Sequence, residues 1–199
     1  MPSSFTKTTN TTLLALQSVA ASSVVVGSAV SIATKLGATA LIRFGRRSAT
    51  AAGASAILRL EGSSASGAAN TWFPIVEIGT AFATCEAEAL TGTVSSGQNV
   101  LTLASTTNLT AQDIIFIDNT TIGNSEFGRI KSIVANTSVT IIDNLVNAQT
   151  GSTIYDAAEI YAPVMIPPEF THVRLVADGS LFTQAFAVEA FLVTVDSIG

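Results

Sequence analysis

Short runs of β-branched or alternating apolar residues recur along the whole chain, each bounded by Gly, Ser, Asn or Thr. They follow one another at a spacing of roughly ten residues, which is typical of β-sandwiches and β-barrels, whereas helical periodicity is weak. The sequence therefore predicts an all-β protein. The expected strands lie at residues 24–32, 38–44, 56–61, 71–78, 81–90, 99–104, 114–118, 126–134, 139–143, 154–161, 171–178 and 183–197.

The composition changes near residue 91, where the chain becomes dense in Thr and Asn. Turn signals such as DNTTIGNS and ANTS join the strands here and favour antiparallel hairpins. We expect an antiparallel, jelly-roll-like β-sandwich body over residues 24–90 and 162–199, with residues 91–161 as an inserted small β-barrel or meander. A second sheet of one continuous sandwich is the alternative for this segment. The three prolines of APVMIPPEF, residues 162–170, predict an end to regular strand pairing.

Residues 1–23 are expected to form an extended N-terminal arm. Their polar start, SSFTKTTNTTLL, leaves backbone donors and acceptors that can add a strand to a neighbour's sheet edge. Deletion of residues 1–22 is therefore expected to weaken contacts between proteins while the β body stays folded.

The low charge of the chain bears on its partners. Charged residues make up 12% of the 199 residues, about half of the roughly 25% usual in soluble domains. The final strand is apolar on both faces, with Phe186 and Leu192 on one and Phe191 and Val193 on the other. Such a strand is central between two layers or is covered by another subunit, so we expect a homo-oligomer. The net charge of −5 argues against nucleic acid as a partner.

No residue between Lys7 and Lys35 is charged, which raises the question of a membrane segment. The run is interrupted by Gln17, Ser18 and Ser22, and it is rich in Ser and Ala. It fits neither a secretory signal peptide nor a spanning helix, and we expect no membrane contact.

Residues suited to chemistry are few. With one cysteine, Cys85, and one histidine, His172, the chain offers no internal disulfide, few metal-ligand sets and no ready catalytic triad. No cofactor is expected. A loose cation site at Asp113, Asp118 or Asn124 is the alternative to ordinary turn chemistry in that stretch.

The densest positive charge is Arg43, Arg46 and Arg47 in IRFGRRS. We predict that it contacts an acidic partner, with a solvated turn as the alternative. Trp72, which follows a loop, is predicted to lie in the core or at a subunit interface.

The strings GATALIRFGRR, DIIFIDNTTIGNSEFGRIKSI and VEAFLVTVDSIG together resemble tailed-bacteriophage virion proteins, in particular capsid decoration (cement) proteins. The resemblance implies a structural role without enzymatic activity or cofactor. It implies a homo-oligomer, with a trimer favoured, that binds the major capsid protein or other virion proteins. The expected location is the capsid exterior of the virion, after synthesis in the bacterial host cytoplasm.

Two alternatives stay open beside a decoration protein. One is a structural component of the phage neck or tail. The other is a carbohydrate-binding β module that contacts the host surface, which would require an exposed aromatic platform. In residues 91–160 only Phe116, Phe127 and Tyr155 could supply one.

Overall fold

The computed structural model describes residues 5–7 and 11–198. Nearly all regular structure in this part of the chain is antiparallel strand, which confirms the predicted all-β fold. The elements are β1 Phe5–Lys7, β2 Thr11–Val19, β3 Val24–Val26, β4 Val30–Ser31, β5 Gly37–Arg46, β6 Ile57–Ser63, β7 Trp72–Gly79, β8 Ala87–Ala89, β9 Thr93–Val94, β10 Val100–Thr102, β11 Ile114–Asp118, the 3-10 turn η1 Ile122–Asn124, β12 Glu126–Val134, β13 Ser138–Ile141, β14 Gln149–Thr150, β15 Thr153–Tyr155, β16 Glu159–Ile166, β17 His172–Asp178 and β18 Phe186–Ile198.

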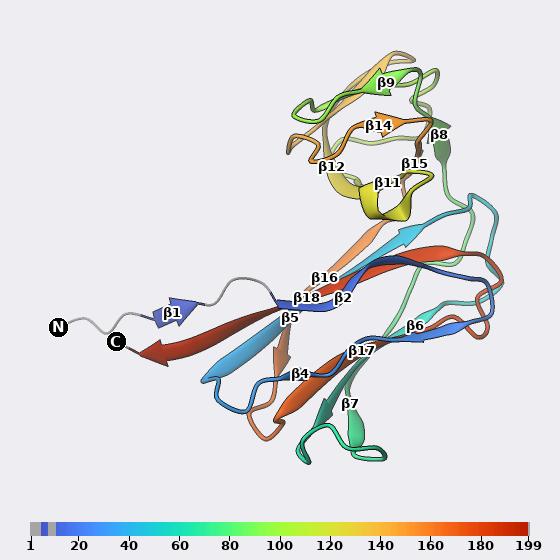
Figure 1. Cartoon of the computed structure of the whole chain (residues 1–199). Helices are drawn as coiled ribbons and strands as arrows, with labels where there is room; N and C mark the ends of the chain where they lie inside the picture. The colour runs from blue at the N-terminus through green and yellow to red at the C-terminus, as the bar shows by residue number, and fades with distance from the viewer. Residues whose placement is uncertain (1–4, 8–10, 199) are drawn as a thin grey trace.

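Two sheets form the body of the molecule (Figure 1). In sheet A, β18 lies between β5 on one side and β2 and β1 on the other, and β16 pairs with the far side of β5. In sheet B, β17 lies between β6 and the short strands β3 and β4, and β7 pairs with β6. The buried apolar residues of both sheets belong to one cluster, so the two sheets pack face to face.

Alternation along β18 and β5 explains this core. Phe186, Val188, Ala190 and Leu192 are buried and belong to the core cluster, and the alternate residues of β5 from Ala38 to Phe44 lie beside them. The rings of Phe44, Phe182 and Phe186 have centroids 5.2 to 6.0 Å apart, which fills the end of the core with aromatic contacts.

The structure differs from the sequence prediction in the N-terminal segment. Thr11–Val19 forms an integral strand of sheet A paired with β18, and Leu13, Leu14 and Val19 are buried in the core. The expectation of an extended arm is therefore wrong for Thr11–Val19, and we now expect deletion of residues 1–22 to destabilise the body, because it would remove a strand and three core side chains. Residues 1–4 and 8–10 of the expected arm lie outside the described residues.

Residues 87–155 form a separate β unit, which we call the module. The chain leaves sheet B after β7, builds the module from β8 to β15, and returns to sheet A with β16. The module's main sheet has the order β10-β13-β12-β11-β15-β8, and its buried residues form a second core around Leu101, Ile115 and Ile130. The expected limits of 91–161 shift because β8 pairs with β15 and β16 pairs with β5.

Proline misled the sequence prediction near residue 163. β16 runs through Pro163 to Ile166, with a cis Ala162–Pro163 bond and a register shift against β5 between Tyr161 and Val164. Pro163 is accepted here because β16 is an edge strand with a neighbour on one side only, so the N–H that proline lacks is not needed for pairing with a second strand. Beyond the end of β5 at Arg46, which is itself buried, the loop to β6 places Ala52 and Ala56 in the core.

Candidate interaction surfaces

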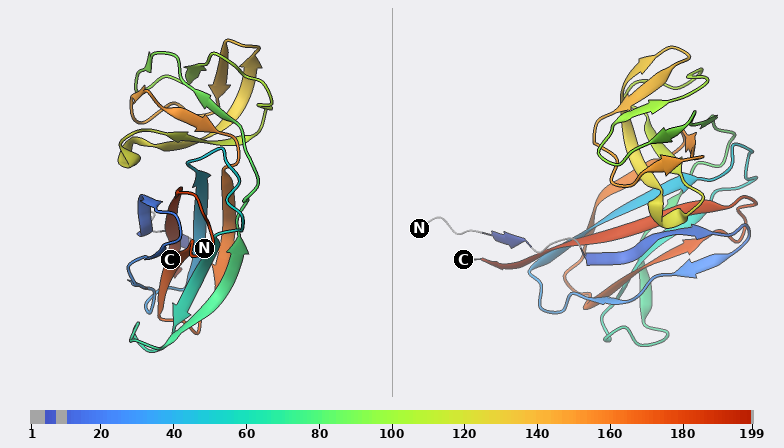
Figure 2. Two further views of the ribbon diagram at one scale, coloured as in Figure 1. Left: turned by 90° about the vertical axis from the view of Figure 1, so that its right-hand side faces the viewer. Right: turned by 45° about the horizontal axis from the view of Figure 1, so that its top comes forward.

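The module rests on one end of the outer face of sheet A (Figure 2). Phe116 of β11 is fully buried in a small cluster with Ala187 of β18, and Phe127 packs beside it with ring centroids 4.9 Å apart. Gly45 of β5 leaves the space for this ring, since a Cβ there would lie 2.5 Å from the Phe116 Cγ. The module therefore covers sheet A where β5 ends and β18 begins.

The three arginines of the predicted contact cluster lie in three different environments. Arg43 donates from Nη1 to Glu189 Oε1 at 2.9 Å, and its guanidinium lies between the rings of Phe127 and Phe191 at 5.8 and 5.7 Å. Arg47 forms a 2.9 Å ion pair with Asp118 of the module. Arg47 thus links the body to the module, and Arg43 lines the junction between them.

Arg46 is fully buried and takes no part in any surface. Its guanidinium donates to the carbonyls of Ala83 and Thr50 and lies 5.5 Å from the centre of the Phe182 ring. Sequence reasoning treated the three arginines as one patch because they are neighbours in the chain. Alternation within β5 sends Arg43 outward and Arg46 inward, and this separates them.

Trp72 lies on the outer face of sheet B, within a network of charged side chains. The Arg174 guanidinium lies 4.2 Å from the centre of the Trp72 ring and forms a 2.7 Å ion pair with Glu61. Arg59 joins Asp178 at 3.2 Å and Glu61 at 3.7 Å. Because these charges are matched within the chain and stay in contact with water, the outer face of sheet B is suited to solvent.

The outer face of sheet A is different beyond the module. Leu41, Phe191, Val193 and Val195 lie there half-buried, and Met165 of the neighbouring strand is 76% exposed. Cross-strand pairing brings Val193 and Met165 to either side of Thr39 on β5. We call this area the open half of sheet A, since the module covers the other half.

A groove of about 440 Å³ runs over the open half. Its walls include Leu36, Thr39, Met165, Pro168, Val193 and Val195, and none of the residues that line it is charged. Leu36, at its rim, is 58% exposed. A recess lined in this way is suited to apolar side chains or to another strand.

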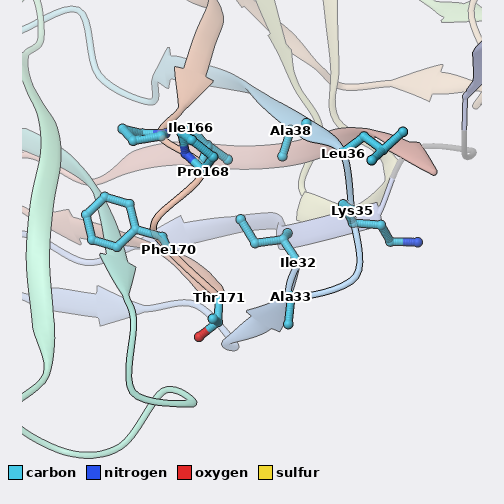
Figure 3. Close-up of a pocket in the computed structure, with 11 residues that line it drawn as sticks. Ile32, Ala33, Lys35, Leu36, Ala38, Ile166, Pro168, Phe170 and Thr171 are labelled. Carbon is cyan, nitrogen blue, oxygen red and sulfur yellow. The ribbon is translucent and has the colours of Figure 1, made fainter. Parts of the chain in front are cut away.

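A smaller cavity of about 70 Å³ opens beside this groove, between the two sheets (Figure 3). Ile32, Ile166 and Phe170 line it together with Leu36 and Ala38, which also line the groove. Its volume is well below the roughly 300 Å³ of small-molecule sites. The cavity therefore extends the groove and does not form a substrate pocket of its own.

The chain also carries a projecting element at this end. β18 pairs with β5 only as far as Val195 opposite Gly37, yet it continues to Ile198. There β1 pairs with it, and the two strands form a ribbon that extends away from the body (Figures 1 and 2). At its base Lys35 and Asp196 form a 2.6 Å ion pair, so these two charges are matched within the chain.

The remaining candidates for chemistry are dispersed. The carboxylate of Asp118 is engaged by Arg47, and that of Asp113 accepts from the Thr110 N–H at 2.8 Å. Burial raises the pKa of the Cys85 thiol, more than the nearby Arg46 lowers it. In the described part of the chain no group of three His, Cys, Asp or Glu side chains is placed to hold a metal ion.

His172 begins β17, and its Nδ1 lies 3.1 Å from the Thr171 hydroxyl oxygen.

Over residues 5–7 and 11–198, no helix has the length and apolar character needed to cross a membrane.

Comparison of the chain with models of known protein families gives no match, and comparison with curated proteins gives no relative.

Sequence reasoning missed most of the open half. It identified the apolar outer positions of β18, among them Phe191 and Val193, because the strand is long and alternates well. Leu41 and Met165 were missed, although Leu41 follows the same alternation along β5. Met165 was missed because the prolines around it predicted an irregular segment.

Proposed function

We propose that this chain is a non-enzymatic structural protein of a tailed-bacteriophage virion that assembles with copies of itself and decorates or cements the capsid exterior. The contrast between the two outer faces carries the proposal. The outer face of sheet B has matched ion pairs, whereas the open half of sheet A has an uncharged groove with Met165 and Leu36 exposed. Large exposed apolar patches on soluble proteins mark interaction sites.

The physical requirements of a cement protein agree with this arrangement. Such a protein holds shell subunits by burying apolar surface and by pairing backbone groups, and both kinds of surface lie at the ribbon end of sheet A. The virion setting rests on the resemblance of the sequence to phage decoration proteins. The major capsid protein is the partner that this setting implies.

Virions from the host strain that carries this gene provide the test. After density-gradient purification, we expect mass spectrometry to find this chain at a copy number comparable with that of the major capsid protein. Antibodies against the chain should label the head in electron micrographs. Label confined to the neck or tail would favour the alternative structural placement, and absence from purified particles would refute a virion role.

The carbohydrate-binding alternative has less support from the site. Phe116 is buried and Phe127 and Tyr155 are half-buried where the module packs on the body, so they form no open aromatic platform. Phe127 does border a furrow of about 280 Å³ together with Arg43 and Asp143. Binding on a glycan array that is lost in Phe127→Ala would favour this alternative over the structural role.

A further inference from the structure

We infer that the furrow between the module and the body binds an acidic segment of a partner protein, with a carboxylate at Arg129 and apolar side chains beside it. The furrow has a volume of about 280 Å³ and is lined from both units, by Arg129, Ile142 and Asp143 of the module and by Arg43 and Ile160 of the body. Clefts between packed units are common ligand sites. The inference rests on the structural role proposed above only for the identity of the partner, which is then a protein of the shell.

Two exposed cations of β12, Arg129 and Lys131, have no ion pair or hydrogen bond with other described side chains. Both point to the outside of the module, because Ile130 between them is buried in the module core. Every other cationic side chain that the structure describes is engaged within the chain, by a carboxylate or, for Arg46, by backbone carbonyls. Two unmatched cations on one face of a strand, in a chain with a net charge of −5, favour an anionic partner at this place.

Arg43 lines the furrow from the body. Its Nη1 donates to Glu189 Oε1, and its guanidinium lies between the rings of Phe127 and Phe191. The side chain is 33% exposed, and an arginine has five N–H donors, so Arg43 can donate to a ligand as well as to Glu189. Because the two rings already hold the guanidinium in place, binding would cost little side-chain entropy here.

The uncharged part of the lining favours a peptide as the ligand. Ile142 and Ile160 are 48% and 38% exposed, so apolar side chains next to the carboxylate would remove this surface from water. None of the residues that line the furrow has a hydroxyl or amide side chain, which are common hydrogen-bonding groups for a sugar ring. The Asp143 carboxylate can accept a backbone N–H of a peptide, whereas it would repel the phosphates of a nucleic acid.

The furrow adjoins a second recess of about 400 Å³, with which it shares Arg43, Phe127 and Asp143. Two further carboxylates line this recess, and both are engaged within the chain. Glu126 accepts from two backbone N–H groups of the loop after β13, and Glu189 accepts from Arg43. A bound segment therefore has room to extend past the furrow, and these two carboxylates do not compete for its N–H groups.

Short capped peptides test the furrow in the full chain without a virion. The ¹⁵N-labelled protein is titrated with acetyl-Leu-Glu-Leu-amide, with acetyl-Leu-Gln-Leu-amide as the uncharged counterpart, and with glucuronate as an acidic sugar. We expect the Glu peptide to shift the NMR signals of the Gly128, Arg129 and Asp143 amides and to bind about tenfold more tightly than the Gln peptide. Added salt should weaken this binding.

A matched pair of variants locates the binding. Arg129→Gln removes the unmatched cation of the furrow, and Arg59→Gln removes the same charge from the outer face of sheet B. We expect Arg129→Gln to weaken binding of the Glu peptide by about tenfold at an unchanged melting temperature, since its side chain is exposed, and Arg59→Gln to bind as the wild-type protein does.

Equal binding of the Glu and Gln peptides, no shift at the three amides, or equal loss of binding in both variants would overturn the inference. Shifts at these amides with glucuronate and not with the Glu peptide would assign the furrow to an acidic sugar and would overturn it too. The proposed virion role is decided separately, by the copy number and the labelling of purified particles, so a failure of one is distinguishable from a failure of the other.

Discussion

Replacing Phe116 by Ala should separate the module from the body without unfolding either of them. Phe116 lies on β11 between Ile115 and Ile117, which belong to the module core, but its own side chain is buried with Ala187 of the body. Because successive side chains of a strand point to opposite faces, the lost contacts fall on the junction and not on the module core. Ile117→Ala is therefore the matched control, one position away on the other face.

The magnitude follows from burial. Phe116 is fully buried, and replacing a buried Phe by Ala costs about 3–5 kcal/mol, which is a large fraction of the roughly 5–15 kcal/mol that stabilises a whole protein. The remaining ties at the junction include the Arg47–Asp118 ion pair, and exposed or half-exposed pairs contribute only about 0–1 kcal/mol. Most of the coupling between the two units should thus be lost.

Differential scanning calorimetry gives the readout. We expect the wild-type chain to unfold in one transition and Phe116→Ala to unfold in two, with faster proteolysis in the connecting residues 80–86 and 156–158. Ile117→Ala should instead lower the melting temperature of the module itself. A single transition in Phe116→Ala, lowered as much as in Ile117→Ala, would refute the separation of junction from module core.

Three further substitutions probe the same framework. Gly45→Ala should lower the free energy of unfolding in urea by about 1–3 kcal/mol, because its Cβ would lie 2.5 Å from the Phe116 Cγ. In a double-mutant cycle with Phe116→Ala, the double variant should lose less stability than the sum of the two single losses. Additive losses would argue against that contact. Burial raises the pKa of Glu189 above its usual 4.5, more than Arg43 lowers it, so this carboxyl contributes stability below pH 4.5 that is lost as pH rises through the folded-state pKa. The wild-type protein should therefore gain stability relative to Glu189→Gln as the pH falls towards 4.5, and parallel pH profiles would contradict the shift. Because burial raises its pKa, the Cys85 thiol should react slowly with a disulfide reagent at pH 8 until denaturant is added, and equal rates in both states would show an accessible thiolate.

Strand positions could be predicted from the sequence where turn signals bound a run rich in β-branched and aromatic residues. Ile114–Asp118 and Glu126–Val134 have the bounds that the pattern indicates, since each such run lies between clear turn signals. Thr11–Val19 could not be recognised, because Thr and Gln occupy its outer positions and resemble an exposed arm. Its assignment depends on pairing with β18, a strand far away in the chain.

The candidate surface could be predicted only in part, for a related reason. Apolar residues on both faces of β18 are visible in the sequence, but the groove also needs Leu36, Thr39 and Met165 from other segments. Their neighbourhood is fixed by the pairing of β5 with both β18 and β16. Tertiary pairing of this kind leaves no local signal in a single sequence.

The expectation that the final strand is central between two layers holds for its inner residues, whereas cover by another subunit stays a prediction for its outer side. Its inner residues, Phe186 to Leu192 in alternation, lie between the two sheets of the body. On its outer side the module covers Ala187, whereas Val193 and Val195 remain along the groove. An insertion of 69 residues thus removes one half of an apolar sheet face from water and leaves the other half beside the projecting ribbon. Since the opposite sheet has matched charges on its outside, contact between copies through the open half of sheet A would remove the uncharged groove from water while leaving the ion-paired face in solvent.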